Sequence, residues 1–207
     1  MQTKDHKTLA LQLLSNTDHK NLRRFRWAFL LGCVEPDYNP LTYMRGSLHH
    51  RPFHGHNAEN VQQHIEKCLK KLQASSLRSP LSYFTLGTLI HYVADTFTFP
   101  HQARFRGSTR NHIQYEHQLH HLFLMKLSDL PGIETNITSS PLRNFLALEH
   151  RQYCAAPHSM DTDCIYIIQI CTTLLDKLLH SAPTTINLHT VWEADSYYEG
   201  SYHYGLV

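Results

Sequence analysis

The sequence has no long apolar segment and no large excess of charge of either sign. Its two apolar runs, WAFLLGCV and CIYIIQICTTLL, are shorter than the roughly 20 residues that cross a bilayer, so we expect no transmembrane segment. The formal net charge is +2 with the histidines neutral. A general nucleic-acid-binding protein carries a much stronger basic excess, so we also expect no stable complex with nucleic acid.

Cysteines are few, and their spacing does not suggest disulfides. There are 5 of them, an odd number, and no two form a CxxC pair. This pattern favours reduced thiols over a disulfide framework. The first residues, MQTKDHKTLALQLLSNTDHK, include acidic and polar side chains where a secretion signal has a continuous apolar run. We therefore expect no signal peptide and a cytoplasmic location.

The chain also lacks the apolar and polar alternation that is typical of strands. Helical periodicity predicts helices over residues 5–15, 18–33, 57–74, 81–97, 109–127, 142–152 and 162–180. The second of these is expected to end before Pro36, and residues 38–55, rich in Pro, Gly, Asn and His, are expected to form an irregular loop. These features predict an all-α fold.

A length of 207 residues suits one domain. We expect a single-domain, multi-helix bundle over residues 1–182. Residues 183–207 form an aromatic C-terminal tail without periodicity, which we expect to pack on the same domain. The oligomeric state does not follow from these features.

Histidine is the residue that the chain has in excess, with 18 histidines against 8 glycines. They are dispersed along the chain, which argues against a purification tag or a histidine-rich tract. Metal binding and a response to pH are the two physical roles that would require so many imidazoles.

Five possible metal ligands lie between Leu86 and Glu116. His91 and Asp95 are four residues apart, so they share one face of a helix that is otherwise apolar and buried. Their burial is costly unless a partner such as a metal ion satisfies them. His101 follows a proline that ends or bends this helix, and His112 repeats the four-residue spacing with Glu116. Nitrogen and oxygen ligands in this pattern predict a zinc site on two helices.

The same stretch, LGTLIHYVADTFTFPHQARF followed by NHIQYEHQL, resembles the signature of the zinc-dependent phospholipase C family, which is related to the S1/P1-type single-strand nucleases. The resemblance implies an all-helical domain with a trinuclear zinc cluster between its helices. It implies that His91 and Asp95 bind on the first helix and that Asp95 bridges two zincs. It also implies that His101, His112 and Glu116 complete a second centre.

Earlier segments offer further candidates. The segment CVEPDYNP resembles the Asp-Tyr segment of the family, which implies that Asp37 acts as a general base or orients the attacking water. Without the downstream motif, Asp37 is more simply interpreted as a turn residue. The family also uses a histidine from the following loop, for which FHGHN offers His54 or His56, and a histidine of the first helix, here His6. Some members bind zinc through an N-terminal tryptophan that this chain lacks, so we expect either two or three zinc ions.

The resemblance implies metal-assisted hydrolysis of a phosphate ester, with a phospholipid as the first candidate substrate and a metal-activated water as the nucleophile. Arg104 and Arg106 lie between His101 and His112, where they could bind a phosphate, although a solvated loop explains them equally well. One alternative is an S1/P1-like nuclease or another soluble phosphodiesterase. A second is a non-catalytic zinc- or phosphate-binding helical domain. An open coordination position would distinguish a catalytic zinc site from a structural one.

Overall fold

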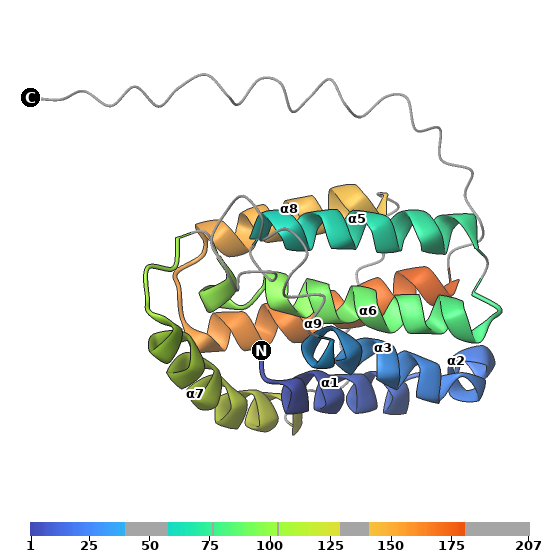
Figure 1. The fold of residues 1–207 in the computed structure, drawn as a ribbon, viewed down its shortest axis with the longest axis horizontal. Coiled ribbons are helices and arrows are strands. Elements are labelled where there is room, and N and C mark those ends of the chain that lie inside the picture. The colour runs from blue at the N-terminus through green and yellow to red at the C-terminus, as the bar shows by residue number, and fades with distance from the viewer. Residues whose placement is uncertain (40–57, 76, 103, 129–140, 181–207) are drawn as a thin grey trace, which may run out of the picture.

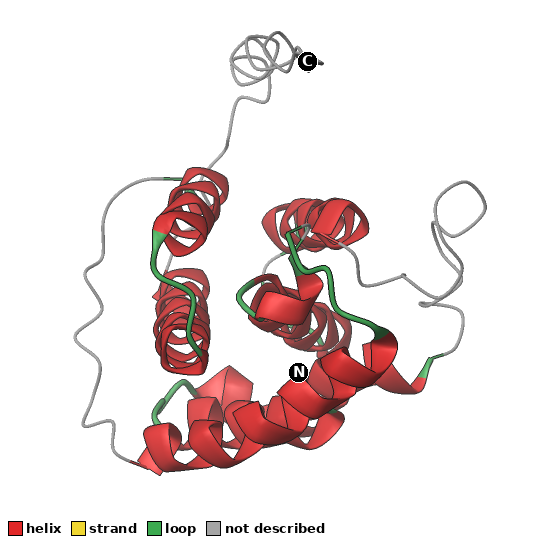
Figure 2. Cartoon of the chain, turned by 90° about the vertical axis from the view of Figure 1, so that its left-hand side faces the viewer, coloured by secondary structure: helices red, strands yellow, loops and turns green. Residues whose placement is uncertain are grey.

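The structure is a computed structural model that describes residues 1–39, 58–75, 77–102, 104–128 and 141–180. Within these residues every regular element is a helix, as Figure 2 shows. The elements are α1 (Thr3–Ser15), α2 (Lys20–Arg24), α3 (Arg26–Tyr38), α5 (Ala58–Ala74), α6 (Pro80–Thr96), the 3-10 helix η1 (Phe99–His101), α7 (Thr109–Ser128), α8 (Leu142–Ala155) and α9 (Met160–His180). The all-α prediction is confirmed. The predicted C-terminal tail lies outside the described residues.

Helix α6 forms the centre of the bundle, between α3 on one side and α5 on the other (Figure 1). It also packs against α9 and α1. Its start is fixed by a capping box, in which the Ser82 N–H donates to the Ser79 hydroxyl over 3.2 Å while the Ser82 side chain lies 3.2 Å from the Ser79 amide. Its side chains are buried almost all round, as the apolar sequence predicts. No helix among the described residues is long and apolar enough to span a membrane.

Helices α3 and α6 cross at a point where each helix has a glycine. A Cβ atom on Gly87 would lie 2.1 Å from the carbonyl oxygen of Phe29, and one on Gly32 would lie 2.1 Å from the carbonyl oxygen of Phe84. The two backbones therefore touch, and no larger residue fits at either position. This contact brings the C-terminal half of α3 against the face of α6 that carries His91.

Gly87→Ala is expected to destabilise the fold by about 1–3 kcal/mol, because the new methyl group would meet a backbone atom that cannot rotate away. Chemical denaturation of wild type and variant measures this free energy of unfolding. Gly107→Ala is the matched control, since the atoms nearest to a Cβ at Gly107 would be side-chain atoms, the far end of the Phe105 ring and the Asn111 Cβ, and not backbone atoms. Equal losses in the two variants would contradict the helix-crossing argument.

Two helices replace the single helix that the sequence predicts over residues 18–33, because the chain leaves helical geometry at Phe25. The prediction that the helix ends before Pro36 is wrong. Pro36 lies buried inside the last turn of α3, and the helix continues to Tyr38 with the Asn39 N–H donating to the Glu35 carbonyl over 3.0 Å. Pro36 only removes one N–H donor here. As a consequence, Asp37 is a helical residue and not a turn residue.

Candidate metal centre

The first group of possible ligands combines His6 of α1 with His91 and Asp95 of α6. All three are buried, and each offers a donor atom within 4.8 Å of the other two. His6 Nε2 lies 3.2 Å from Asp95 Oδ1, and His91 Nε2 lies 3.4 Å from Asp95 Oδ2. The two imidazole rings stack at 3.8 Å between centroids. The four-residue spacing on α6 therefore places both side chains in one cluster, and α1 adds the third.

A backbone carbonyl fixes the orientation of His91. Its Nδ1 lies 2.9 Å from the carbonyl oxygen of Cys33 on α3, so a neutral imidazole donates from Nδ1 and presents Nε2 to Asp95. A hydrogen bond of this kind is how proteins select the ring tautomer of a histidine that binds metal. The close approach of α3 and α6 at their glycines makes this contact possible.

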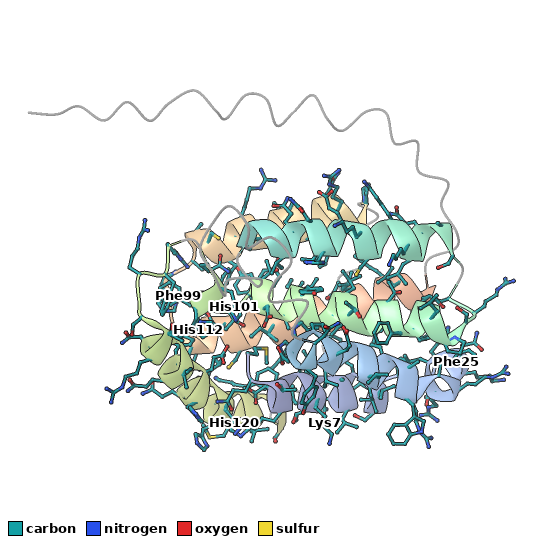
Figure 3. All side chains as sticks on the ribbon, in the orientation of Figure 1. Lys7, Phe25, Phe99, His101, His112 and His120 are labelled. Atoms are coloured by element: carbon teal, nitrogen blue, oxygen red, sulfur yellow. The ribbon has the colours of Figure 1, made fainter. Side chains whose placement is uncertain are left out.

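The second group consists of His101 of η1 with His112 and Glu116 of α7. Glu116 Oε1 lies 2.9 Å from His112 Nε2 and 3.4 Å from His101 Nε2. Figure 3 shows His101 and His112 at the end of the bundle where α7 begins. His101 Nε2 is also 3.7 Å from Asp95 Oδ1. The Asp95 carboxylate thus faces both groups, the position needed by a bridging ligand.

The structure also brings the backbone amine of Met1 into this cluster. The nitrogen lies 2.9 Å from Asp95 Oδ1, 3.0 Å from Glu116 Oε1 and 3.3 Å from His101 Nε2. Burial lowers the pKa of this amine, but the charges of Asp95 and Glu116 outweigh burial and raise the pKa to about 11. The sequence alone gave no reason to include Met1, because the resemblance to the family implied a tryptophan at this point.

Burial keeps two of the imidazoles in the neutral form that binds metals. It lowers the pKa of His6 to about 4 and also lowers the pKa of His101, partly offset there by Asp95. For the carboxylate of Glu116, neighbouring groups outweigh the effect of burial on the pKa. Burial disfavours the charge of Glu116, yet the Met1 ammonium and hydrogen bonds to the neighbouring histidines lower its pKa below the usual range. Neutral imidazoles beside ionised carboxylates form a set of ligands ready for a divalent cation.

Several donor atoms of the cluster are buried without a hydrogen bond in the described part of the chain. They include both ring nitrogens of His6 and Oδ2 of Asp37. Asp37 Oδ1 lies 3.6 Å from His91 Nε2, so Asp37 borders the first group. Buried polar atoms rarely stay unsatisfied. A zinc ion bound to one ring nitrogen of His6 would satisfy that nitrogen. The residues present therefore fit zinc.

The remaining predicted residues are not all gathered here. His54 and His56 lie outside the described residues, so the contribution of either one stays a prediction. Arg104 is exposed and donates from Nη1 to the Cys154 carbonyl over 3.0 Å, with its guanidinium 5.5 Å from the centre of the Phe99 ring. It thus lies against α8, and Arg106 is exposed to solvent. A substrate role for either arginine stays a prediction.

A buried carboxylate that sequence reasoning missed supports the second group. Asp163 of α9 is fully buried and accepts three hydrogen bonds. They come from the Phe99 N–H at 2.9 Å, the Tyr115 hydroxyl at 2.8 Å and the Tyr153 hydroxyl at 2.9 Å. Phe99 is two residues before His101, and Tyr115 directly precedes Glu116. Asp163 therefore ties together the two segments that carry the second group.

Asp163→Asn is expected to weaken zinc binding about 10- to 100-fold, the usual effect of losing a group that orients metal ligands. An amide in place of the carboxylate leaves at least one of the three donors without an acceptor. Competition with a chromophoric chelator measures the affinity, and the d–d spectrum of the cobalt-substituted protein reports the ligand geometry.

Asp161→Asn is the matched control, because Asp161 lies on the same helix, is 56% exposed and pairs with Lys126. Tyr115→Phe removes a single donor of the network and should give a smaller loss of affinity. Unchanged zinc affinity in Asp163→Asn, with only lower thermal stability, would mean that Asp163 supports the fold alone.

Comparison with known proteins identifies the family of the chain. Comparisons with curated proteins and with solved structures gave no match. A family model described as zinc dependent phospholipase C matches residues 5–182. The matched range includes His6, Asp37 and both ligand groups, and it covers most of the 207 residues. The chain belongs to the zinc-dependent phospholipase C family.

Proposed function

We propose that this protein is a zinc-dependent phosphodiesterase that hydrolyses phospholipids in the manner of a phospholipase C. One observation carries the proposal: two adjacent groups of nitrogen and oxygen ligands share the carboxylate of Asp95, and Asp37 lies beside them. Membership of the family supports a zinc-dependent hydrolase. Adjacent metal ions are typical of enzymes that cleave phosphate esters.

Each ligand group would hold one zinc ion. His6, His91 and Asp95 would bind the first, and His101, His112 and Glu116 the second. We propose two or three zinc ions per chain in total. Zinc bound there supplies a Lewis acid that polarises phosphoryl oxygens and lowers the pKa of a bound water.

Asp37 has the properties of the group that orients the attacking water and takes its proton. Its side chain is 12% exposed, and its Oδ2 atom makes no hydrogen bond to the described residues. A carboxylate oxygen that is not already occupied can accept a hydrogen bond from water and hold it in one direction. The position of Asp37 on helix α3 keeps its carboxylate beside His91, with Oδ1 3.6 Å from the His91 Nε2 atom.

Asp37→Asn is expected to lower kcat by about 10²- to 10⁴-fold, because an amide can orient a water but cannot take its proton. Zinc content should change little. Steady-state kinetics on an aryl phosphocholine, together with metal analysis, checks both parts. Glu35→Gln is the control on the same helix, since Glu35 pairs with Asn39. A variant Asp37→Asn with normal kcat would exclude Asp37 as the base.

The experiment that tests the function combines zinc analysis by mass spectrometry with a panel of substrates. The panel contains an aryl phosphocholine, phosphatidylcholine vesicles and single-stranded nucleic acid. We expect bound zinc and turnover of both choline esters. Turnover of nucleic acid alone would replace the proposal with a nuclease. Full zinc without any turnover would indicate a non-catalytic domain, and substoichiometric zinc would contradict the metal centre itself.

A further inference from the structure

Helix α3 carries a row of exposed apolar side chains on the face turned away from the bundle. Trp27 is 71% exposed, Leu31 58% and Tyr38 74%, and Val34 between them is partly exposed. Spacings of four, three and four residues place these side chains along one face of a helix. The opposite face packs into the core through Phe29, Gly32, Cys33 and Pro36. The exposed row, called here the α3 stripe, is therefore not needed to hold α3 in place.

Positive charge gathers where the α3 stripe begins. Lys20, Arg23, Arg24 and Arg26 are all exposed. Arg23 pairs with Asp18 at 2.5 Å, while the described residues provide no carboxylate partner for the other three. The Arg26 guanidinium lies 5.4 Å from the centre of a ring of Trp27. Uncompensated basic side chains thus stand directly beside exposed aromatic and aliphatic groups.

We propose that the α3 stripe and these basic residues dock the protein on the surface of an anionic phospholipid bilayer. The proposal rests on the proposed function, because a phospholipase C must reach phosphodiesters that are held in a membrane. Tryptophan and tyrosine favour the boundary between lipid headgroups and acyl chains. Lysine and arginine bind the lipid phosphates and are attracted by the negative surface potential of such a membrane. A helix with an apolar row and adjacent basic residues has the composition of interfacial helices.

The same helix connects the docking surface to the ligand cluster. Asp37 directly precedes Tyr38, the last residue of the stripe, and points about 100° around the helix from it. The Cys33 carbonyl on α3 holds His91. Trp27 and Tyr38 are separated by roughly 16 Å along the axis, at 1.5 Å per residue. A membrane that contacts the whole stripe would therefore lie beside the Asp37 end of the site.

The first experiment measures whether Trp27 enters lipid. The chain has a second tryptophan, Trp192, so the full-length, zinc-loaded protein with Trp192→Phe leaves Trp27 as the reporter. Vesicles of phosphatidylcholine with phosphatidylserine are expected to shift its emission to the blue, and brominated lipids should quench it. The shift should weaken without phosphatidylserine and at high salt. A protein that binds these vesicles without any change in Trp27 emission overturns the proposal.

The second experiment compares two double variants in vesicle flotation. Trp27→Gln with Leu31→Gln removes the apolar part of the stripe and is expected to weaken binding on the order of tenfold or more, because both side chains lose their burial in lipid. Met125→Gln with Leu148→Gln is the matched control, at positions that are 59% and 46% exposed on α7 and α8. Its binding should stay within about twofold of wild type. Equal losses in both variants overturn the proposal.

A second copy of the chain is the competing occupant of the stripe. Sedimentation velocity without lipid tests it, and a monomeric wild type is expected. A wild-type dimer that dissociates in the Trp27→Gln, Leu31→Gln variant would assign the stripe to a dimer interface and overturn the proposal.

Vesicle binding needs no turnover, so the docking proposal and the proposed function can be contradicted independently. Hydrolysis of a water-soluble phosphocholine ester without vesicle binding would overturn docking alone. Vesicle binding through Trp27 without phospholipid hydrolysis would overturn the proposed function alone.

Discussion

Asp95→Asn is expected to release zinc from both ligand groups and to lower turnover of a phosphocholine ester by on the order of 10³-fold or more, since polarisation of the phosphate and activation of the water are lost together. One oxygen of Asp95 lies 3.2 Å from His6 and 3.7 Å from His101, and the other lies 3.4 Å from His91. An asparagine keeps the size of the side chain but loses its charge and one of the two acceptor oxygens. Zinc analysis and steady-state kinetics measure the two effects.

The control for this substitution is Asp18→Asn, which removes a carboxylate that is 95% exposed and pairs only with Arg23 among the described residues. It should leave zinc content and kinetics unchanged. Loss of zinc from Asp95→Asn at one group only would contradict the bridging position. Circular dichroism must show that the variant remains helical for the comparison to hold.

Local spacing predicted the pairs that lie on single helices. His91 with Asp95, and His112 with Glu116, are each four residues apart, and a helix brings such side chains together whatever the rest of the fold does. His101 was expected near them because Pro100 predicts an end or a bend of the buried helix. In the structure α6 already ends at Thr96, and Pro100 lies in η1. The meeting of the two pairs at Asp95 depends on the packing of α6 against η1 and of α7 against α9 and α1. Only the resemblance to the family predicted it.

Contacts between distant segments could not be predicted from one sequence. Asp163 is 48 residues from Tyr115 and 64 from Phe99, and no periodicity links them. The error at Pro36 has a local cause, because the helix tolerates a missing N–H in its last turn when the surrounding packing is favourable. That error affected only the alternative interpretation of Asp37 as a turn residue, because Asp37 belongs to the helix that crosses α6.

Zinc is expected to raise the thermal stability of the protein markedly. At a free zinc concentration 100 times the Kd, binding to the folded state adds about 2.7 kcal/mol. For a domain of this size that corresponds to an increase in Tm of about 5–10 °C. Calorimetry of the zinc-loaded protein and of the chelated protein measures the difference. Asp95→Asn should show little response to zinc, and a wild type with equal Tm in both states would contradict a preformed metal centre.

The contribution of His6 to the stability of the zinc-free protein should fall as the pH decreases. The pKa of His6 is about 4 in the folded state against an ordinary value of 6.5, so the unfolded chain binds a proton that the folded chain does not. The His6 contribution is present above pH 6.5 and is lost between about pH 6.5 and 4. Protons also compete with zinc for the same imidazoles, so the increase in Tm caused by zinc should shrink over this range. Denaturation at a series of pH values, with and without zinc, tests both effects, and an increase in Tm caused by zinc that stays constant from pH 7 to pH 4 would contradict histidine ligation.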